Sequence, residues 1–284
     1  MNYLILSIVT ASSLYAIFKM FSRFGINNLH AITINYFTAF TLGFLLSPLK
    51  ITLKELPALP WFYYAMGLGV LFISVFNVMA YTSQKNGMAV ASTASKMSVV
   101  IPVLAGILLY GESKGILKIV GVLLAIYAVY LTASKNEGVQ NKAKGLLFPI
   151  LLFFGSGAID TLLKYVENQF VSNESVALFS ACIFLFAGIF GLISWWITRQ
   201  LRIDFKSIAG GIVLGIPNYF SVYFLIKTLA FEGIESSTAF TIINVAVVAL
   251  STLIGLMVFK EKLSLKNRLG VLLAIISIFI VAYF

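Results

Sequence analysis

The sequence predicts an all-α polytopic membrane protein with ten transmembrane helices, built as two inverted five-helix repeats. Composition is the first observation behind this prediction: 60% of the 284 residues are hydrophobic and 11% are charged, whereas a soluble domain carries about 25% charged residues. A series of long apolar stretches is the second observation, and similarity between the two halves of the chain is the third. A soluble fold of this length cannot bury so much apolar surface, so we exclude that class.

Ten apolar stretches have roughly the 17–25 residues with which an α-helix crosses about 30 Å of hydrocarbon. In chain order they cover residues 2–22, 30–48, 61–83, 88–110, 116–133, 145–165, 175–198, 207–230, 238–259 and 267–284. Short segments with turn-forming or charged residues separate them, at Ser47-Pro48, Lys85-Asn86-Gly87, Gly111–Lys114, Lys135–Gly138, Arg199–Lys206 and Lys260–Lys262. None of these segments is long enough for a soluble domain, so each stretch is predicted to be one membrane-spanning helix.

A hexapeptide occurs once in each half of the chain. Gly121-Val-Leu-Leu-Ala-Ile126 recurs as Gly270-Val-Leu-Leu-Ala-Ile275, 149 residues later, and Glu112 and Glu261 in the preceding loops are also 149 residues apart. The equal offsets indicate an internal duplication. Each glutamate is expected to cap the start of the helix that follows it, with a role in gating as the alternative.

The predicted copies are residues 1–138 and 139–284, and Lys19 and Lys164 fall late in the first helix of each copy. Five helices per copy is an odd number, so the second copy enters the membrane from the opposite side. This is the inverted-repeat architecture of carriers that work by alternating access, with a central site between the halves.

The formal net charge is +10, which in a soluble protein would suggest nucleic-acid binding. Here the basic residues lie mainly between apolar stretches, so we expect contact with the lipid bilayer and no nucleic-acid partner. Most of them are in the odd-numbered loops, so the positive-inside rule places those loops in the cytoplasm and both termini outside. Cys182 and His30 are each the only residue of their type, so we predict neither an internal disulfide nor a metal site, and no cofactor.

Paired motifs resemble the drug/metabolite transporter superfamily, specifically its ten-helix EamA-like carriers. The first predicted helix contains Ser12-Ser13-Leu-Tyr-Ala-Ile-Phe-Lys19, and the sixth contains Gly157-Ala-Ile-Asp-Thr-Leu-Leu-Lys164. Glu112 before Gly121 and Glu261 before Gly270 look like the repeated Glu-then-Gly signature of the family. Two positions depart from the family pattern, at Leu14-Tyr15 and at Asn35-Tyr36, and they leave the substrate rather than the fold open.

The resemblance implies export or exchange of small metabolites, and no enzymatic activity. We therefore expect an integral multi-pass protein of the bacterial inner (cytoplasmic) membrane that binds a small-molecule substrate and exists as a monomer or homodimer.

Five ionisable residues lie within the predicted helices: Lys19, Lys96, Asp160, Lys164 and Lys227. Lys96 is deepest, and a charge at the bilayer centre costs roughly 2.5–3.5 kcal/mol on insertion scales, so it is expected to face a watery, protein-lined cavity. Asp160 and Lys164 share a helix face and either neutralise each other or face that cavity. Four lysines against one aspartate favour a substrate with a negatively charged group.

Polar side chains at similar predicted depth complete the candidate substrate site, together with Lys96, Lys19, Lys164 and Asp160. These are Asn77, Tyr81, Asn218, Tyr219 and Asn244. Pro102 and Pro217 remove backbone donors within helices and are the candidate hinge or gating positions. Gly211 and Gly215 form a GxxxG pattern, which is expected to let two helices pack closely.

The predicted function is secondary transport of a small metabolite, an amino acid or another carboxylate-bearing solute, by alternating access. One alternative is a proton-coupled exporter of lipophilic cations that uses Asp160. A second, from another class, is a membrane-embedded lipid-modifying enzyme, which the lack of clustered His, Cys or acidic residues in or beside the apolar stretches disfavours.

Overall fold

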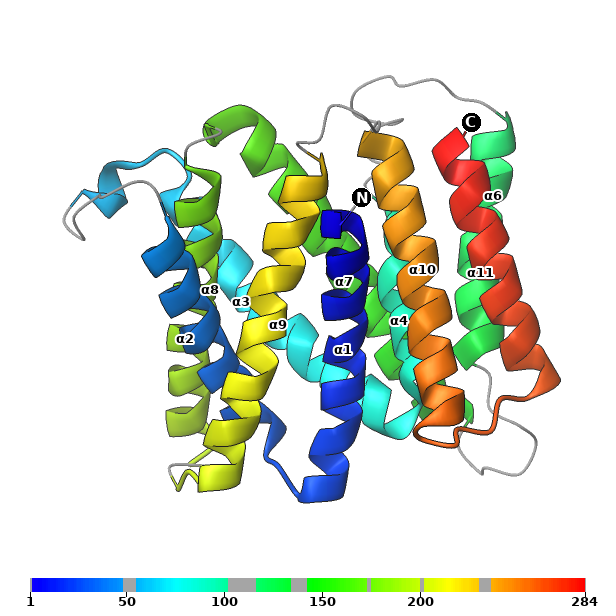
Figure 1. The fold of residues 1–284 in the computed structure, drawn as a ribbon, viewed down its shortest axis with the longest axis horizontal. Helices are drawn as coiled ribbons and strands as arrows, with labels where there is room; N and C mark the ends of the chain where they lie inside the picture. Colours follow the sequence, from blue (N-terminus) through cyan, green and yellow to red (C-terminus); the bar gives the residue numbers. More distant parts are fainter. Residues whose placement is uncertain are drawn as a thin grey trace. The chain divides into compact units, whose positions relative to one another are not determined.

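The computed structural model describes residues 2–47, 55–101, 116–133, 142–172, 175–199, 202–229 and 236–283. Within these residues all regular structure is helical (Figure 1). The elements are α1 (Asn2–Phe24), α2 (Asn28–Leu46), the 3-10 helix η1 (Leu56–Ala58), α3 (Phe62–Lys85), α4 (Met88–Met97), α6 (Ile116–Ala133), α7 (Lys142–Phe170), α8 (Val176–Ile197), α9 (Phe205–Leu229), α10 (Ser236–Met257) and α11 (Leu265–Tyr283). The all-α prediction is confirmed for this part of the chain.

Each predicted apolar stretch coincides with a described helix, although the ends differ by several residues at α7. The prediction of one helix over 88–110 is only partly met, because α4 ends at Met97 and a turn follows at Ser98 and Val99. Residues 102–115 lie outside the described part. Among the described helices, six are long and apolar enough to cross a membrane, namely α1, α2, α3, α7, α8 and α9. Shorter apolar segments lie in α6 and α10. The chain is therefore an integral membrane protein with several spanning helices.

Contacts between residues divide the chain into two units. Unit 1 comprises Met1–Lys19, Val78–Ala158 and Phe220–Phe284, and unit 2 comprises Met20–Asn77 and Ile159–Tyr219. Each unit therefore contains residues from both predicted copies. Helices α1, α3, α7 and α9 each begin in one unit and end in the other.

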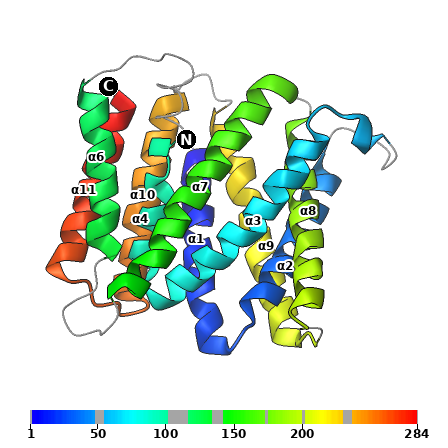
Figure 2. The same ribbon diagram turned by 180° about the vertical axis from the view of Figure 1, so that it is seen from behind.

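In unit 1, α6 and α11 lie side by side along their lengths (Figures 1 and 2). Ser277 in α11 donates a hydrogen bond from its hydroxyl to the carbonyl of Gly121 in α6 at 2.7 Å. Near the other end of the pair, the side chain of Asn267 donates to the carbonyl of Thr132 at 2.5 Å. A late residue of α11 thus contacts an early residue of α6, and the reverse, so the two helices are antiparallel.

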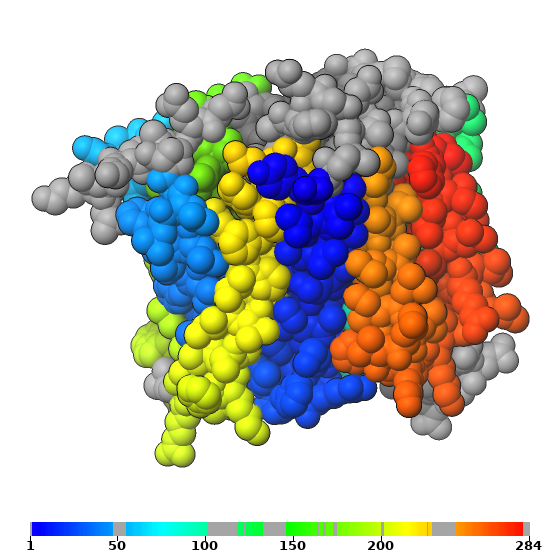
Figure 3. Space-filling view, viewed as in Figure 1, coloured from blue at the N-terminus to red at the C-terminus, as the bar shows by residue number. Residues whose placement is uncertain are grey.

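Helices α4 and α10 complete this side of unit 1. Ala89 of α4, Val248 of α10 and Val271 of α11 form a buried apolar cluster, with Leu263 and Ile275 packed against it. The side chains of α10 (orange) and α11 (red) meet without a gap on the face seen in Figure 3. These contacts fix the position of the segment between α10 and α11, which carries part of the candidate site.

Unit 2 is organised around α2 and α8, which pack closely because small residues of α8 face α2. A Cβ added to Gly188 would lie 3.0 Å from the ring of Phe37, and one added to Gly191 would clash with Thr33. A second core in unit 2 contains Trp61 and Cys182, each 1% exposed. Cys182 is the small buried apolar residue that its neighbours in the sequence indicate.

Helix α9 begins with a carboxylate cap. The backbone N–H of Ser207 donates to Oδ1 of Asp204 at 2.6 Å, and hydrogen bonds from the Ser207 hydroxyl and N–H hold the pKa of the exposed Asp204 below its usual value. The Ser207 hydroxyl in turn accepts a hydrogen bond from the N–H of Asn27, which caps α2. The starts of α2 and α9 are therefore tied together in unit 2.

Candidate functional site

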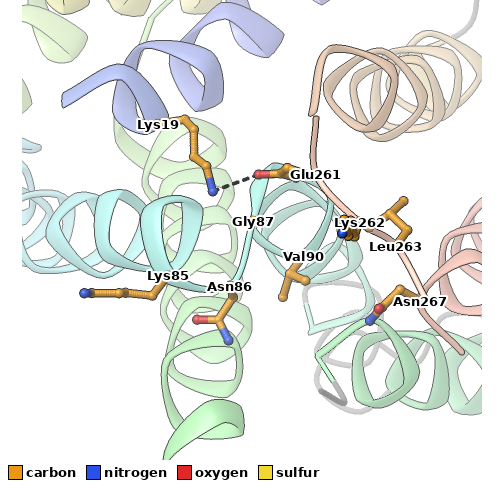
Figure 4. A pocket seen from close by; sticks show the side chains of 9 residues that line it. All are labelled: Lys19, Lys85, Asn86, Gly87, Val90, Glu261, Lys262, Leu263 and Asn267. Carbon is orange, nitrogen blue, oxygen red and sulfur yellow. Dashed lines mark ion pairs between the residues drawn. The ribbon is translucent and has the colours of Figure 1, made fainter. Parts of the chain in front are cut away.

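An ion pair in unit 1 joins the end of α1 to the segment between α10 and α11. Nζ of Lys19 lies 2.9 Å from Oε1 of Glu261, as the dashed line in Figure 4 marks. The Lys19 amine also donates a hydrogen bond to the backbone carbonyl of Gln84, at 3.3 Å. The two charged side chains are 20% and 11% exposed, so solvent ions screen their attraction less than that of a surface pair.

The Glu261 carboxylate also caps the start of α4. The backbone N–H of Met88 donates to both carboxylate oxygens, at 3.1 Å each. The residue before α4 is Gly87, which has no side chain to act as a cap and a positive φ of 104°. A carboxylate supplied from elsewhere satisfies the free N–H, and the positive end of the helix dipole favours its charge.

Two glycines make room for this carboxylate. A Cβ added to Gly87 would lie 2.9 Å from Oε2 of Glu261, and one added to Gly255 would lie 2.7 Å from the same oxygen. Distances below 3.0 Å are essentially never seen for real Cβ atoms, so larger residues at these positions would displace the carboxylate. Lys19, Met88 and the two glycines together form a closely fitting receptor for one carboxylate, which we call the carboxylate cradle.

A pocket of about 200 Å³ opens beside the cradle. Its lining is Lys19, Lys85, Asn86, Gly87, Val90, Glu261, Lys262, Leu263 and Asn267 (Figure 4). Three lysines and one glutamate give this lining an excess of positive charge. In Figure 4 the Lys85 amine points away from the ion pair, whereas Lys19 and Glu261 point toward each other.

Lys96, the deepest charge in the sequence prediction, lies in the last turn of α4 and is partly buried. Ser92 and Thr93 beside it in α4 are fully buried. The hydroxyls of Ser95 in α4 and Ser156 in α7 lie 3.3 Å apart, within hydrogen-bonding distance. The side chain of Lys96 is therefore partly shielded by its neighbours in the protein.

The structure places the predicted polar residues in different surroundings. Asn218 is 2% exposed and donates from Nδ2 to Oδ1 of Asn35 at 3.1 Å, and Tyr219 is 5% exposed. Asn77 donates to the carbonyl of Ile73 in its own helix at 2.7 Å.

In unit 1, Tyr81 is 38% exposed and its ring centroid lies 4.1 Å from that of Phe148. Asn244 is buried in α10.

The remaining predicted residues are less fully described. Asp160 is exposed on α7, and the side chain of Lys164 lies outside the described part. Pro217 stands inside α9, whereas Pro102 and Glu112 fall outside the described residues. Lys227 is exposed, with its amine 5.8 Å from the centroid of the Tyr223 ring.

Sequence reasoning predicted the kind of role that Glu261 has but not its partners. We expected it to cap α11, the helix that follows. In the structure it caps α4, while Ser264 and Asn267 cap α11 reciprocally: each backbone N–H donates to the side chain of the other, at 3.1 Å. The sequence does indicate this arrangement. Ser264-Leu-Lys-Asn267 provides a cap for α11, so α11 does not need Glu261, whereas Gly87 before Met88 has no side chain that could cap α4.

Comparison with known proteins decides the family. The model of the EamA-like transporter family matches residues 2–134. An uncharacterized protein of Haemophilus influenzae is 31% identical over 295 aligned positions, covering 100% of this chain and 98% of that protein. The chain belongs to the EamA-like transporter family. This places it in the drug/metabolite transporter superfamily, as the paired motifs predicted, and in a family whose members are small-molecule transporters.

The fold of this EamA-like transporter is also found in a crystal structure. The two superpose with a TM-score of 0.64 at 14% identity, over 99% of this chain and 96% of that one. At this identity the likeness concerns the fold alone.

Proposed function

We propose that this EamA-like transporter is a secondary carrier of a small carboxylate-bearing metabolite, such as an amino acid, and works by alternating access. The carboxylate cradle is the observation that carries the proposal. A lysine of a membrane helix, Lys19, together with the N–H of Met88, already holds one carboxylate in a site that opens on a positively charged pocket. The excess of lysine over acidic residues in the spanning segments points to the same class of solute.

Alternating access needs two equivalent halves, and the contact between α6 and α11 supports the inverted ten-helix repeat. Gly121 contacts Ser277, and a Cβ on Gly270 would lie 3.0 Å from the carbonyl of Ala128. Residues 121 and 270 are 149 positions apart, and so are residues 128 and 277, so each pair occupies equivalent positions in the two copies. The contact of residue 121 with 277 is therefore equivalent to the contact of residue 270 with 128. An antiparallel pair with exchanged contacts is what two inverted copies produce around a twofold axis.

In the proposed carrier, Lys96 lies in the central cavity with Lys19, Lys164 and Asp160. A second set of residues orients the solute: Asn77, Tyr81, Asn218, Tyr219 and Asn244. Pro102 and Pro217 are proposed as hinges, because a missing backbone donor weakens a helix locally. We place the protein in the bacterial inner membrane as a monomer or homodimer.

A two-step experiment tests the proposal. A thermal-shift screen of purified protein against amino acids, organic acids and phosphosugars identifies the solute, since a ligand stabilises the state that it binds. Uptake of that solute is then measured in proteoliposomes. We expect Lys96→Ala to reduce uptake to the level of protein-free vesicles while the melting temperature stays near that of the wild type.

Lys206→Ala is the matched control, because this lysine is exposed at the start of α9, and it should keep normal uptake. Unchanged uptake by Lys96→Ala would contradict the assignment. The drug sensitivity of cells carrying Asp160→Asn tests the rival function. A lipophilic-cation exporter that uses this exposed carboxylate would lose drug resistance in the variant. A carrier of anions would give no drug resistance in either form, so the variant would not change it.

A further inference from the structure

We infer that the carboxylate cradle is a solute-binding site that Glu261 fills in this structure, and that the carboxylate of a solute takes its place when the segment between α10 and α11 withdraws. The inference deepens the proposed function by naming a site of contact for the solute. It depends on that function only for its consequence in transport, because binding to the cradle is measured separately.

The first step of the argument is the chemistry of the cradle. Its donors are an ammonium group 2.9 Å from one oxygen and a helix N-terminal N–H 3.1 Å from both. These donors recognise a carboxylate as such and make no use of the rest of the glutamate side chain. A small carboxylate that presents its two oxygens in the same way meets the same donors.

The second step is the place of the present occupant in the chain. Glu261 belongs to a short non-helical segment, so its carboxylate can leave without unwinding α10 or α11. Lys260, directly before it, has a left-handed φ of 52° just after the end of α10, where the backbone N–H of Glu261 donates to the carbonyl of Gly255 at 2.9 Å.

The third step is access. An ion pair that only fastens helices together needs no opening beside it, whereas here the adjoining pocket measures about 200 Å³. This is room for several water molecules or for a small organic acid. The lining also contains Lys85 and Lys262, whose charges raise the local concentration of anions.

Chemical rescue tests the cradle directly. In Glu261→Ala the carboxylate is missing, so the variant should melt at a lower temperature than the wild type. Formate should restore at least half of the loss, and chloride at equal ionic strength should not. Lys206→Met in the Glu261→Ala background should respond like Glu261→Ala, because Lys206 is exposed at the start of α9 and does not line the pocket. Lys19→Met in that background should abolish the response.

Equal effects of formate and chloride, or full rescue without Lys19, would overturn the inference. A second variant tests displacement with Glu261 in place, and so does not depend on the folding of Glu261→Ala. Leu263→Cys puts a thiol in the pocket lining, and the natural Cys182 is 1% exposed. Acetate should speed the reaction of this thiol with a maleimide several-fold over chloride, and an unchanged rate would contradict displacement.

The two proposals fail in different ways. Formate rescue and faster labelling without uptake of any carboxylate in proteoliposomes would keep the site and reject the carrier. Carboxylate uptake that needs Lys96, without rescue or faster labelling, would keep the carrier and reject the cradle as a site.

Discussion

The side-chain amide of Asn218 in α9 donates to the Oδ1 atom of Asn35 in α2, and both residues are almost fully buried. Within a membrane-embedded protein such an amide finds no water to replace a lost partner. Sequence reasoning identified Asn218 as a polar residue in an apolar stretch, and likewise Lys19. It did not identify Asn35 or Glu261 as their partners, because residues on separate helices pair at no fixed spacing along the chain.

Asn218→Leu should lower the free energy of unfolding by about 1 kcal/mol, since interhelical hydrogen bonds in membrane proteins average about 0.6 and reach about 1.7 kcal/mol. Asn35→Leu should cost a similar amount. Because both changes remove the same bond, the double variant should lose less than the sum of the single losses. Unfolding of the purified protein in denaturing detergent measures this cycle, and strictly additive losses would show that the bond contributes nothing.

At the scale of helices, the sequence predicted where each helix lies but not everything that ends it. The position of a spanning helix is set by the length of its apolar stretch, which can be read from neighbouring residues in the sequence. The cap of a helix start is not always local: α11 has its own cap in Ser264 and Asn267, whereas α4 depends on Glu261 from another segment. A prediction that assigned Glu261 to the following helix was therefore wrong about the partner.

The predicted close packing at Gly211 and Gly215 of α9 is confirmed, and α2 is the partner. A Cβ on Gly211 would lie 2.5 Å from Cβ of Ile34, and one on Gly215 would lie 2.6 Å from Cβ of Thr38. Gly211→Leu should therefore force α9 away from α2 and lower the free energy of unfolding by about 1–3 kcal/mol. Detergent-induced unfolding measures the change.

Gly67→Leu is the control for this prediction, because a Cβ at Gly67 meets nothing within 4 Å. It should leave the free energy of unfolding close to that of the wild type. A similar loss in both variants would mean that helix propensity or expression, and not contact with α2, explains the effect.

For the whole molecule, the sequence predicted the class of protein and its family, and the structure adds which segments meet. Glu261 between α10 and α11 binds Met88 at the start of α4, so the third and ninth predicted loops lie at the same end of unit 1. The third loop carries Lys85, and the ninth carries Lys260, Lys262 and Lys266. Unit 1 contains residues from both predicted copies. This could not be predicted from hydropathy, because hydropathy carries no information about contacts between distant parts of the chain.

The orientation of the chain follows from the sorting of charge between its loops and is open to test. The positive-inside rule places the loop with Leu263 in the cytoplasm. In intact bacterial cells, Leu263→Cys should react with a membrane-impermeant maleimide only after the membrane is permeabilised. The wild type, whose single cysteine is 1% exposed, should stay unlabelled in both conditions. Labelling in intact cells would reverse the orientation.

The antiparallel contact of α6 with α11 also bears on how the protein is made. Gly121 and Ser277 are 156 positions apart, and a ribosome adds about 5–20 residues per second. The face of α6 that α11 covers is therefore without its partner for about 8–30 s, while the rest of the chain is synthesised. Unit 1 cannot finish assembling before the last helix is inserted, and lipids or insertion chaperones must cover that face during the delay.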